Sequence, residues 1–348
     1  MIIDAHAHLL PKDYPGDAPE CFPRMEPVEG STDRLLVFGQ TRFPAKEVFF
    51  EAERRVEAMD ASGVDAEIVS PMPPLLRYDL PAADGLSLAR HVNEFAAELS
   101  SHAPERIMAL GLVPMQDPDA AAAELSAVVD AGLPGVEIAS NILGRSIGDE
   151  SFRPFFAEAE RLGVAIFVHA MPAPMDRLPM SAMGTHVVGI EGTFAAGSMI
   201  LGGTAAACPD LRISFSHAAG GIAMTLPRAN YFWGGSWNEE PVDLDRALMH
   251  DDGPSPLEYA RRFYYDSMVF DRRTIRYLID LLGADRLLVG SDFPAMPRED
   301  PAARTLRAMD LPEEEWQDIS WRNALRWIGR EPVAAAPGAP SFRGTEGA

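Results

Sequence analysis

The chain alternates short apolar segments with longer segments in which apolar residues recur at helical spacing. The short segments are rich in Val, Ile and Phe, which is typical of strands buried on both faces of a parallel sheet. These predicted strands lie at residues 1–6, 64–71, 107–114, 135–139, 164–169, 211–216, 263–268 and 286–291. The helical segments lie at residues 49–62, 86–103, 117–131, 151–162, 194–207, 270–282, 300–309 and 313–329. Eight strands alternating with helices predict an α/β fold, a single (β/α)8 TIM barrel.

Glycines mark the ends of several of these helices. Gly63, Gly163 and Gly283 each stand where a helix should stop before the next strand. Two segments, residues 10–47 and 170–193, are long and irregular, and each follows a strand. They are therefore expected on the C-terminal face of the barrel, where long loops shape active sites.

The pattern predicts one catalytic domain over residues 1–331. The remaining residues, 332–348, are rich in Ala, Pro and Gly, show no periodicity, and predict a flexible C-terminal tail.

The charge of the chain narrows the possible partners. With 52 acidic and 30 basic residues, the formal net charge is −22. Such a surface disfavours nucleic acid, which is bound mainly through Lys and Arg on phosphates, and it repels anionic lipid. No apolar stretch is long enough for a membrane span, and the start MIIDAHAHLL does not resemble a signal peptide. We therefore expect a cytoplasmic protein without a nucleic-acid or membrane partner.

Four of the eight histidines fall at the ends of predicted strands. His6 and His8 are two residues apart on the first strand, so their rings can share one face. His169 ends the fifth strand, His217 ends the sixth, and Asp292 follows the eighth. Barrel geometry brings the ends of these strands to one mouth, and imidazole with carboxylate is a good ligand set for zinc or a similar divalent ion. The five residues together predict a metal site.

These residues and their surroundings resemble the amidohydrolase superfamily. Within it, the chain is most similar to the branch of amino-carboxymuconate-semialdehyde decarboxylase and the aromatic-acid decarboxylases. The resemblance rests on His6-Ala-His8, on the stretch Pro104–Asp117, on Phe167-Val-His169, on Ser216-His217 with Gly220-Gly221, and on Gly290-Ser-Asp-Phe-Pro294.

The resemblance implies roles for the residues of the mouth. One divalent metal, most often zinc and in some members manganese, would be held by His6, His8, His169 and Asp292. His217 would then be the catalytic acid/base, with Asp292 the second catalytic residue. Glu137, on the fourth strand, would support the ligands from behind. A homodimer is also expected from the resemblance.

Substrate contacts are predicted at residues other than the metal ligands. Arg42, in the long segment after the first strand, is the candidate for gripping a substrate carboxylate, with Arg24 and Arg34 as competitors. Phe293 could stack on a substrate ring, while Met171 and Trp233 could line the pocket. A surface salt bridge for Arg42 and plain packing for the other three remain open.

Three functions are compatible with this set of residues. The first is metal-dependent, non-oxidative decarboxylation of a small aromatic or unsaturated carboxylic acid. The second is hydrolysis of an amide, lactone or related bond in a small cyclic substrate, in which a metal-bound hydroxide would attack the carbonyl. Hydration of a double bond is a variant of this second function. A metal-binding barrel without catalysis is disfavoured, because His217 would then have no task. The acidic surface favours a small, mostly apolar monocarboxylate as the substrate.

Overall fold

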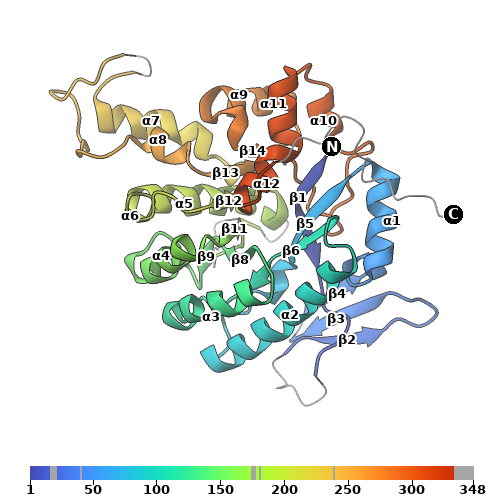
Figure 1. Cartoon of the computed structure of the whole chain (residues 1–348). Coiled ribbons are helices and arrows are strands. Elements are labelled where there is room, and N and C mark those ends of the chain that lie inside the picture. Colours follow the sequence, from blue (N-terminus) through green and yellow to red (C-terminus); the bar gives the residue numbers. More distant parts are fainter. Residues whose placement is uncertain (16–21, 40, 174–177, 180–181, 238–239, 333–348) are drawn as a thin grey trace.

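The computed structural model describes residues 1–332 except 16–21, 40, 174–177, 180–181 and 238–239. Parallel strands follow one another around a barrel, and helices cover the outside (Figure 1). In chain order the barrel strands are β1 (Ile3–Leu9), β5 (Ala66–Pro71), β6 (Ile107–Ala109) with β7 (Gly111–Leu112), β8 (Gly135–Ala139), β11 (Ala165–His169), β12 (Ile213–Phe215), β13 (Tyr264–Asp266) and β14 (Leu287–Leu288). Each overlaps one of the eight predicted strands, and the predicted fold class is confirmed.

The hydrogen-bond ladder between the barrel strands is interrupted in two places. One parallel sheet has the order β1-β5-β6, and the other has the order β14-β13-β12-β11-β8-β7. Leu110 separates β6 from β7, which continue the same direction of the chain. On the other side, the backbone N–H of Ala5 donates to the carbonyl of Val289 at 2.8 Å, so β1 meets the chain beyond β14 through bridges rather than a regular ladder.

The barrel strands are buried on both faces. Every residue of β1, β8 and β11 is buried, because helices cover the outer face and side chains fill the interior. The apolar runs in the sequence arise from this double burial. Polar residues on such strands, among them His6 and His8, are fully enclosed and need partners inside the barrel.

The helices lie on the outside of the barrel (Figure 1). Gly63 and Gly163 end α1 and α4 in the left-handed conformation, with φ of 75° and 66°, as the sequence predicts. The helices are α1 (Ala52–Ser62), α2 (Ala82–His102), α3 (Pro118–Asp130), α4 (Arg153–Leu162), α5 (Val188–Leu201), α6 (Thr204–Ala207), α7 (Ile222–Gly234), α8 (Pro256–Ala260), α9 (Arg272–Leu282), α10 (Arg304–Arg307), α11 (Glu313–Gln317) and α12 (Asn323–Trp327).

Several elements differ from the prediction. The segment 10–47 is not only loop: it contains an antiparallel sheet of β2 (Arg24–Pro27), β3 (Arg34–Phe38) and β4 (Thr41–Ala45), which its prolines and glycines conceal. The region after β12 contains α7 and α8, for which no helix is predicted, and a short antiparallel pair follows β8, formed by β9 (Asn141–Ile142) and β10 (Arg145–Ser146).

The C-terminal helices close the end of the barrel opposite the histidines. Trp327 on α12 is fully buried and meets Phe167 edge to face, with ring centroids 5.8 Å apart. Phe167 in turn lies 4.9 Å from the ring of His6. Core side chains therefore pack against the ring of His6 on the side of the C-terminal helices. The predicted tail, 332–348, lies outside the described residues apart from Pro332.

Among the described residues, none of the helices combines the length and the apolar character that crossing a bilayer requires.

Candidate metal centre

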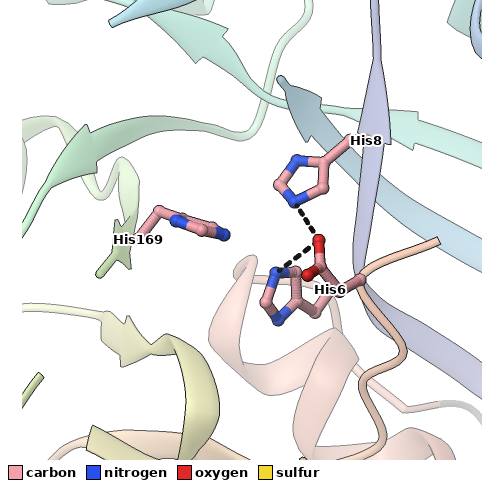
Figure 2. Close-up of side chains that lie close together, drawn as sticks. His6, His8 and His169 are labelled. Carbon is pink, nitrogen blue, oxygen red and sulfur yellow. Dashed lines mark ion pairs between the residues drawn. The ribbon is translucent and has the colours of Figure 1, made fainter. Parts of the chain in front are cut away.

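Strand β1 supplies two buried histidines whose rings face the interior of the barrel. His6 and His8 have no exposed surface, and their ring centroids are 5.1 Å apart. Spacing by two along an extended strand places both side chains on the same side. His169, the last residue of β11, points toward them from across the barrel, with ring centroids 5.2 Å from each (Figure 2).

Asp292 completes this group from the loop after β14. Its Oδ1 lies 3.0 Å from His8 Nε2 and 3.8 Å from His6 Nε2. One ligand atom from each of His6, His8, His169 and Asp292 can be chosen so that all four lie within 4.8 Å of one another. The structure therefore brings together the four residues that the resemblance implies as ligands.

The histidine nitrogens show what this group can hold. The Nε2 atoms of His6, His8 and His169 are buried and have no hydrogen-bond partner among the described residues. Their Nδ1 atoms do have partners: His6 Nδ1 lies 2.7 Å from Asp266, His8 Nδ1 3.3 Å from Ser70 Oγ, and His169 Nδ1 3.2 Å from the carbonyl of Ala170. Buried nitrogens without partners are unfavourable, whereas Nε2 lone pairs directed at one point suit a cation. The donor set fits a divalent metal ion.

The pKa shifts of His8, His169 and Asp292 leave these three groups in the protonation states that bind a cation. Burial lowers the pKa of His8 and, more strongly, that of His169, so both rings are neutral at neutral pH. Burial alone would raise the pKa of Asp292, but the ring of His8, whose Nε2 lies 3.0 Å from Oδ1, and the positive charge of His6 outweigh burial and hold the pKa below its ordinary value. Asp292 is therefore ionised.

His6 is the exception among the histidines. Burial lowers its pKa, but the hydrogen bond and charge of Asp266, together with Asp292 and Asp4, outweigh burial and raise the pKa to about 9. Without a bound cation, the ring of His6 therefore keeps a second proton at neutral pH. A metal ion that binds Nε2 has to displace that proton.

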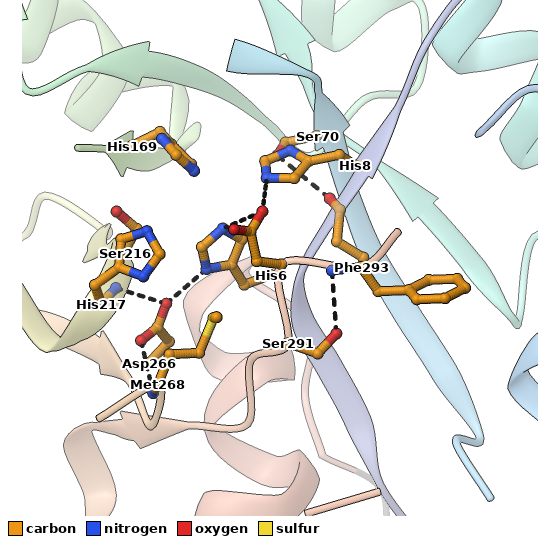
Figure 3. A network of polar contacts seen from close by, with 12 residues as sticks. His6, His8, Ser70, His169, Ser216, His217, Asp266, Met268, Ser291 and Phe293 are labelled. Atoms are coloured by element: carbon orange, nitrogen blue, oxygen red, sulfur yellow. Dashed lines mark hydrogen bonds and ion pairs between the residues drawn. The ribbon is translucent and has the colours of Figure 1, made fainter. Parts of the chain in front are cut away.

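Asp266 is a residue that the sequence analysis missed. It ends β13, and its carboxylate accepts four hydrogen bonds; Figure 3 shows those from His6, His217 and Met268. Oδ2 accepts from His6 Nδ1 at 2.7 Å and from the backbone N–H of His217 at 2.8 Å, while Oδ1 accepts from the N–H groups of Ala218 and Met268 at 3.1 and 3.0 Å. One buried carboxylate thus fixes the ring of His6 and the backbone that carries His217. Its place at a strand end, like that of the histidines, is the signal that could have identified it.

His217 lies beside the four-residue group without joining it. Its ring centroid is 5.2 Å from that of His6 and 5.5 Å from that of His169. His217 and Ala218 both adopt left-handed φ values, 52° and 53°, which for residues other than glycine need support from their surroundings. Burial, followed by the nearby His6, lowers the pKa of His217, so the ring is neutral at neutral pH and can accept a proton.

Comparison with known proteins agrees with this geometry. The sequence model of the amidohydrolase family matches residues 3–330. The chain belongs to the amidohydrolase family. It is 28% identical over 339 residues to 2-amino-3-carboxymuconate-6-semialdehyde decarboxylase of Dictyostelium discoideum, covering 95% of this chain and 92% of the relative. It is 26% identical over 291 residues to gamma-resorcylate decarboxylase of Rhizobium radiobacter, covering 79% of this chain and 86% of the relative.

A solved structure supports the same grouping. The crystal structure of 5-carboxyvanillate decarboxylase LigW from Sphingomonas paucimobilis superposes with a TM-score of 0.68. The two chains are 28% identical, and the match covers 79% of this amidohydrolase and 82% of LigW.

Glu137 lies behind the histidines, inside the barrel. It is fully buried, neither of its carboxyl oxygens has a hydrogen-bond partner among the described residues, and Oε2 is 3.8 Å from His8 Nδ1. Burial raises its pKa to about 8. Glu137 is not one of the four residues of the metal group, and its support of His8 stays a prediction.

Two of the predicted substrate contacts, Arg42 and Phe293, have partners outside the metal group of this amidohydrolase. Arg42 lies on β4 with 60% of its side chain exposed, 3.3 Å from Glu26. The ring of Phe293 points away from the histidines (Figure 3). A role for either in substrate binding stays a prediction that would need a change of position.

The other two contacts remain equally untested. Met171 is half-buried, packs against the core, and accepts a hydrogen bond from Asn141 through its carbonyl at 2.9 Å. Trp233 donates to Asp251 at 3.2 Å and lies beside the ring of His250.

The pKa of His6 predicts that metal binding depends on pH. Below pH 9 a cation competes with one proton on His6, so its affinity should rise by up to about tenfold from pH 7 to pH 8. Asp266→Asn removes the charge that retains this proton and should flatten that dependence. Chelator competition at the two pH values measures it, with Asp271→Asn on the distant cap of α9 as the control. Equal affinity of the wild-type protein at pH 7 and pH 8 would contradict this account of His6.

Proposed function

We propose that this amidohydrolase is a metal-dependent carboxy-lyase that removes CO2 from a small aromatic or unsaturated carboxylic acid. The observation that carries the proposal is a fifth side chain, His217, held beside a complete set of three histidines and one carboxylate. Four protein ligands would be enough for a structural metal. A neutral ring beside them is suited to proton transfer at a bound substrate. The decarboxylases to which the chain is similar support the same reaction class.

The proposed ligands are His6, His8, His169 and Asp292, and the proposed ion is zinc, with manganese as the alternative. When bound, a divalent ion in this donor set supplies positive charge that attracts and polarises substrate oxygens. The three histidine ligands are buried, so little water competes with the substrate for that charge. A carboxylate with a neighbouring hydroxyl or carbonyl group suits such a site.

The chain's own contribution to the chemistry is the placement of one proton. The substrate's hydroxyl group gives a proton to the neutral ring of His217. The bond to the carboxylate carbon breaks, CO2 leaves, and the electron pair remains on the substrate carbon. His217 then returns the proton to that carbon, which leaves the imidazole neutral again, and the deprotonated hydroxyl takes a proton from water after release. Asp266 keeps His217 in position, since it accepts the backbone N–H groups of the turn.

The acidic surface bears on the proposed substrate. With a net charge of −22, the overall field slows the capture of anions, and most strongly that of multiply charged ones. A monocarboxylate with an apolar or aromatic body is therefore the proposed substrate class. The proposed location is the cytoplasm.

Release of CO2 tests the proposed reaction. Protein loaded with zinc or manganese should release CO2 from at least one member of a panel of hydroxybenzoates, aminobenzoates and muconate-like acids. His217→Ala should lower kcat by about 10²–10⁴-fold and leave the metal content unchanged, because His217 moves a proton and is not a ligand. His102→Ala, on the outer end of α2, is the matched control and should leave both unchanged.

Two results would contradict this proposal. Cleavage of amides or lactones by the loaded protein, without CO2 release from the acids, would replace decarboxylation by hydrolysis. Loss of the metal from His217→Ala would show that His217 is a ligand.

We also propose that the protein is a homodimer, joined through one apolar surface. Among the described residues, eight of the fifteen exposed large apolar side chains lie on α5, α7 or the segment 236–249. This segment folds back on α7, where the N–H of Leu248 donates to the carbonyl of Phe232 at 2.9 Å. Figure 1 shows α7 and the chain after it projecting from one side of the barrel. Concentrated apolar surface of this kind is typical of subunit contacts.

The mass in solution tests the homodimer. The wild-type protein should elute with the mass of two chains in light scattering coupled to gel filtration. Leu248→Glu combined with Met249→Glu places two charges in the apolar surface and should shift the mass toward one chain; these two side chains are 74% and 60% exposed. Val129→Glu on α3 is the control and should stay dimeric. A wild-type protein with the mass of one chain at micromolar concentration would contradict the proposal.

A further inference from the structure

Behind the metal group, Arg298 forms a buried ion network with β1 and β5. Its side chain is only 6% exposed. Nε donates to Asp4 Oδ2 at 3.0 Å, Nη1 donates to Ser62 Oγ at 3.2 Å, and Nη2 donates to Glu67. The guanidinium therefore uses all three of its nitrogens on groups that belong to the barrel wall and to the end of α1.

The same side chain also contacts the loop that carries Asp292. Arg298 follows Asp292 by six residues, and its guanidinium lies over the ring of Phe293, 3.9 Å from the centroid. Nε is 3.4 Å from Ser291 Oγ, and that hydroxyl also donates to Asp4. Arg298 thus contacts the residues on both sides of Asp292 and joins them to β1.

Asp292 needs such support because its backbone is strained. Its φ is 58°, a left-handed conformation that residues other than glycine rarely adopt. Backbone bonds hold the loop to β1 as well: the N–H of Asp292 donates to the carbonyl of His6 at 2.8 Å, and the N–H of His8 donates to the carbonyl of Phe293 at 2.7 Å. The side-chain network lies directly beside these bonds.

Charge balance allows the network to exist in a buried position. Glu67 accepts from Arg298 and also from Arg55 Nη1 at 2.6 Å. Arg55 is fully buried and its other terminal nitrogen donates to the carbonyl of His8. Two guanidinium groups therefore face the carboxylates of Asp4 and Glu67, and the network has no net charge. Buried charges are tolerated when they are paired in this way.

We propose that Arg298 is a positioning residue that sets the orientation of the Asp292 carboxylate toward the cation site. This inference rests on the proposed role of Asp292 as a metal ligand. Arg298 is not one of the four residues of the metal group. It holds the loop so that Asp292 reaches the point at which the three Nε2 atoms meet, and its effect is on the affinity and the geometry of the bound ion.

Lysine should not replace Arg298 in this role. A guanidinium offers donors in a planar fork and a flat face for the ring of Phe293, whereas an ammonium is a single compact charge. Arg298→Lys keeps the charge that Asp4 and Glu67 need but cannot serve both carboxylates, Ser62 and the ring together. The two variants Arg298→Lys and Arg298→Met therefore separate the charge of Arg298 from its geometry.

Metal affinity and metal spectroscopy test the inference. Zinc affinity is measured by chelator competition, and the ligand geometry by the visible absorption spectrum of the cobalt-loaded protein. Arg298→Met should weaken zinc binding by about 10- to 100-fold and alter the cobalt spectrum, and Arg298→Lys should show the same changes to a smaller degree. The matched control is Arg106→Met. Arg106 is also largely buried and donates to Asp60 at 2.7 Å, but it does not contact the Asp292 loop.

Each outcome bears on the proposal. Wild-type affinity and an unchanged spectrum in folded Arg298→Met would overturn it and leave the proposed metal site intact. If Arg298→Met does not fold, as judged by circular dichroism, Arg298→Lys decides, and an unchanged spectrum there overturns it. An equal loss of affinity in Arg106→Met would show a general effect of instability and also overturn it. A wild-type protein that binds no zinc, cobalt or manganese would contradict the proposed function and this inference together.

Discussion

Three buried imidazole nitrogens without a hydrogen-bond partner are the constraint on which the rest of the site depends. The Nε2 atoms of His6, His8 and His169 face one another and Asp292 inside the barrel. Leaving them unpartnered would be unfavourable in a protein interior, and placing them so close is reasonable only if a cation joins them. The fold meets this requirement because parallel strands end at one mouth, where residues distant in sequence come together.

Two buried polar networks hold the ligands. Asp266 fixes the ring of His6 and the turn of His217, while the network of Arg298 joins the loop of Asp292 to β1. The first links a ligand to the proposed acid/base, and the second links the carboxylate ligand to the barrel wall. Ligand placement therefore depends on groups that never touch the ion.

Much of this arrangement could be predicted from the sequence, because strand ends and metal-ligand residue types are local signals. The eight strands and the gathering of His6, His8, His169 and Asp292 follow from them. Asp266 was missed because an acidic residue at a strand end has many structural uses. The sheet β2–β4 was missed because its strands are short and the segment 10–47 around them contains many prolines. The positions of Arg42 and Phe293 depend on how long loops fold, which no local pattern determines.

Anomalous diffraction from crystals grown with manganese tests the central claim most directly. The account predicts a single strong peak inside the barrel, within about 2.0–2.3 Å of the Nε2 atoms of His6, His8 and His169 and of a carboxylate oxygen of Asp292. His217 should lie beside the ion without binding it. The absence of a peak at this point, or a peak that includes His217 in place of one of the four ligands, would contradict the account.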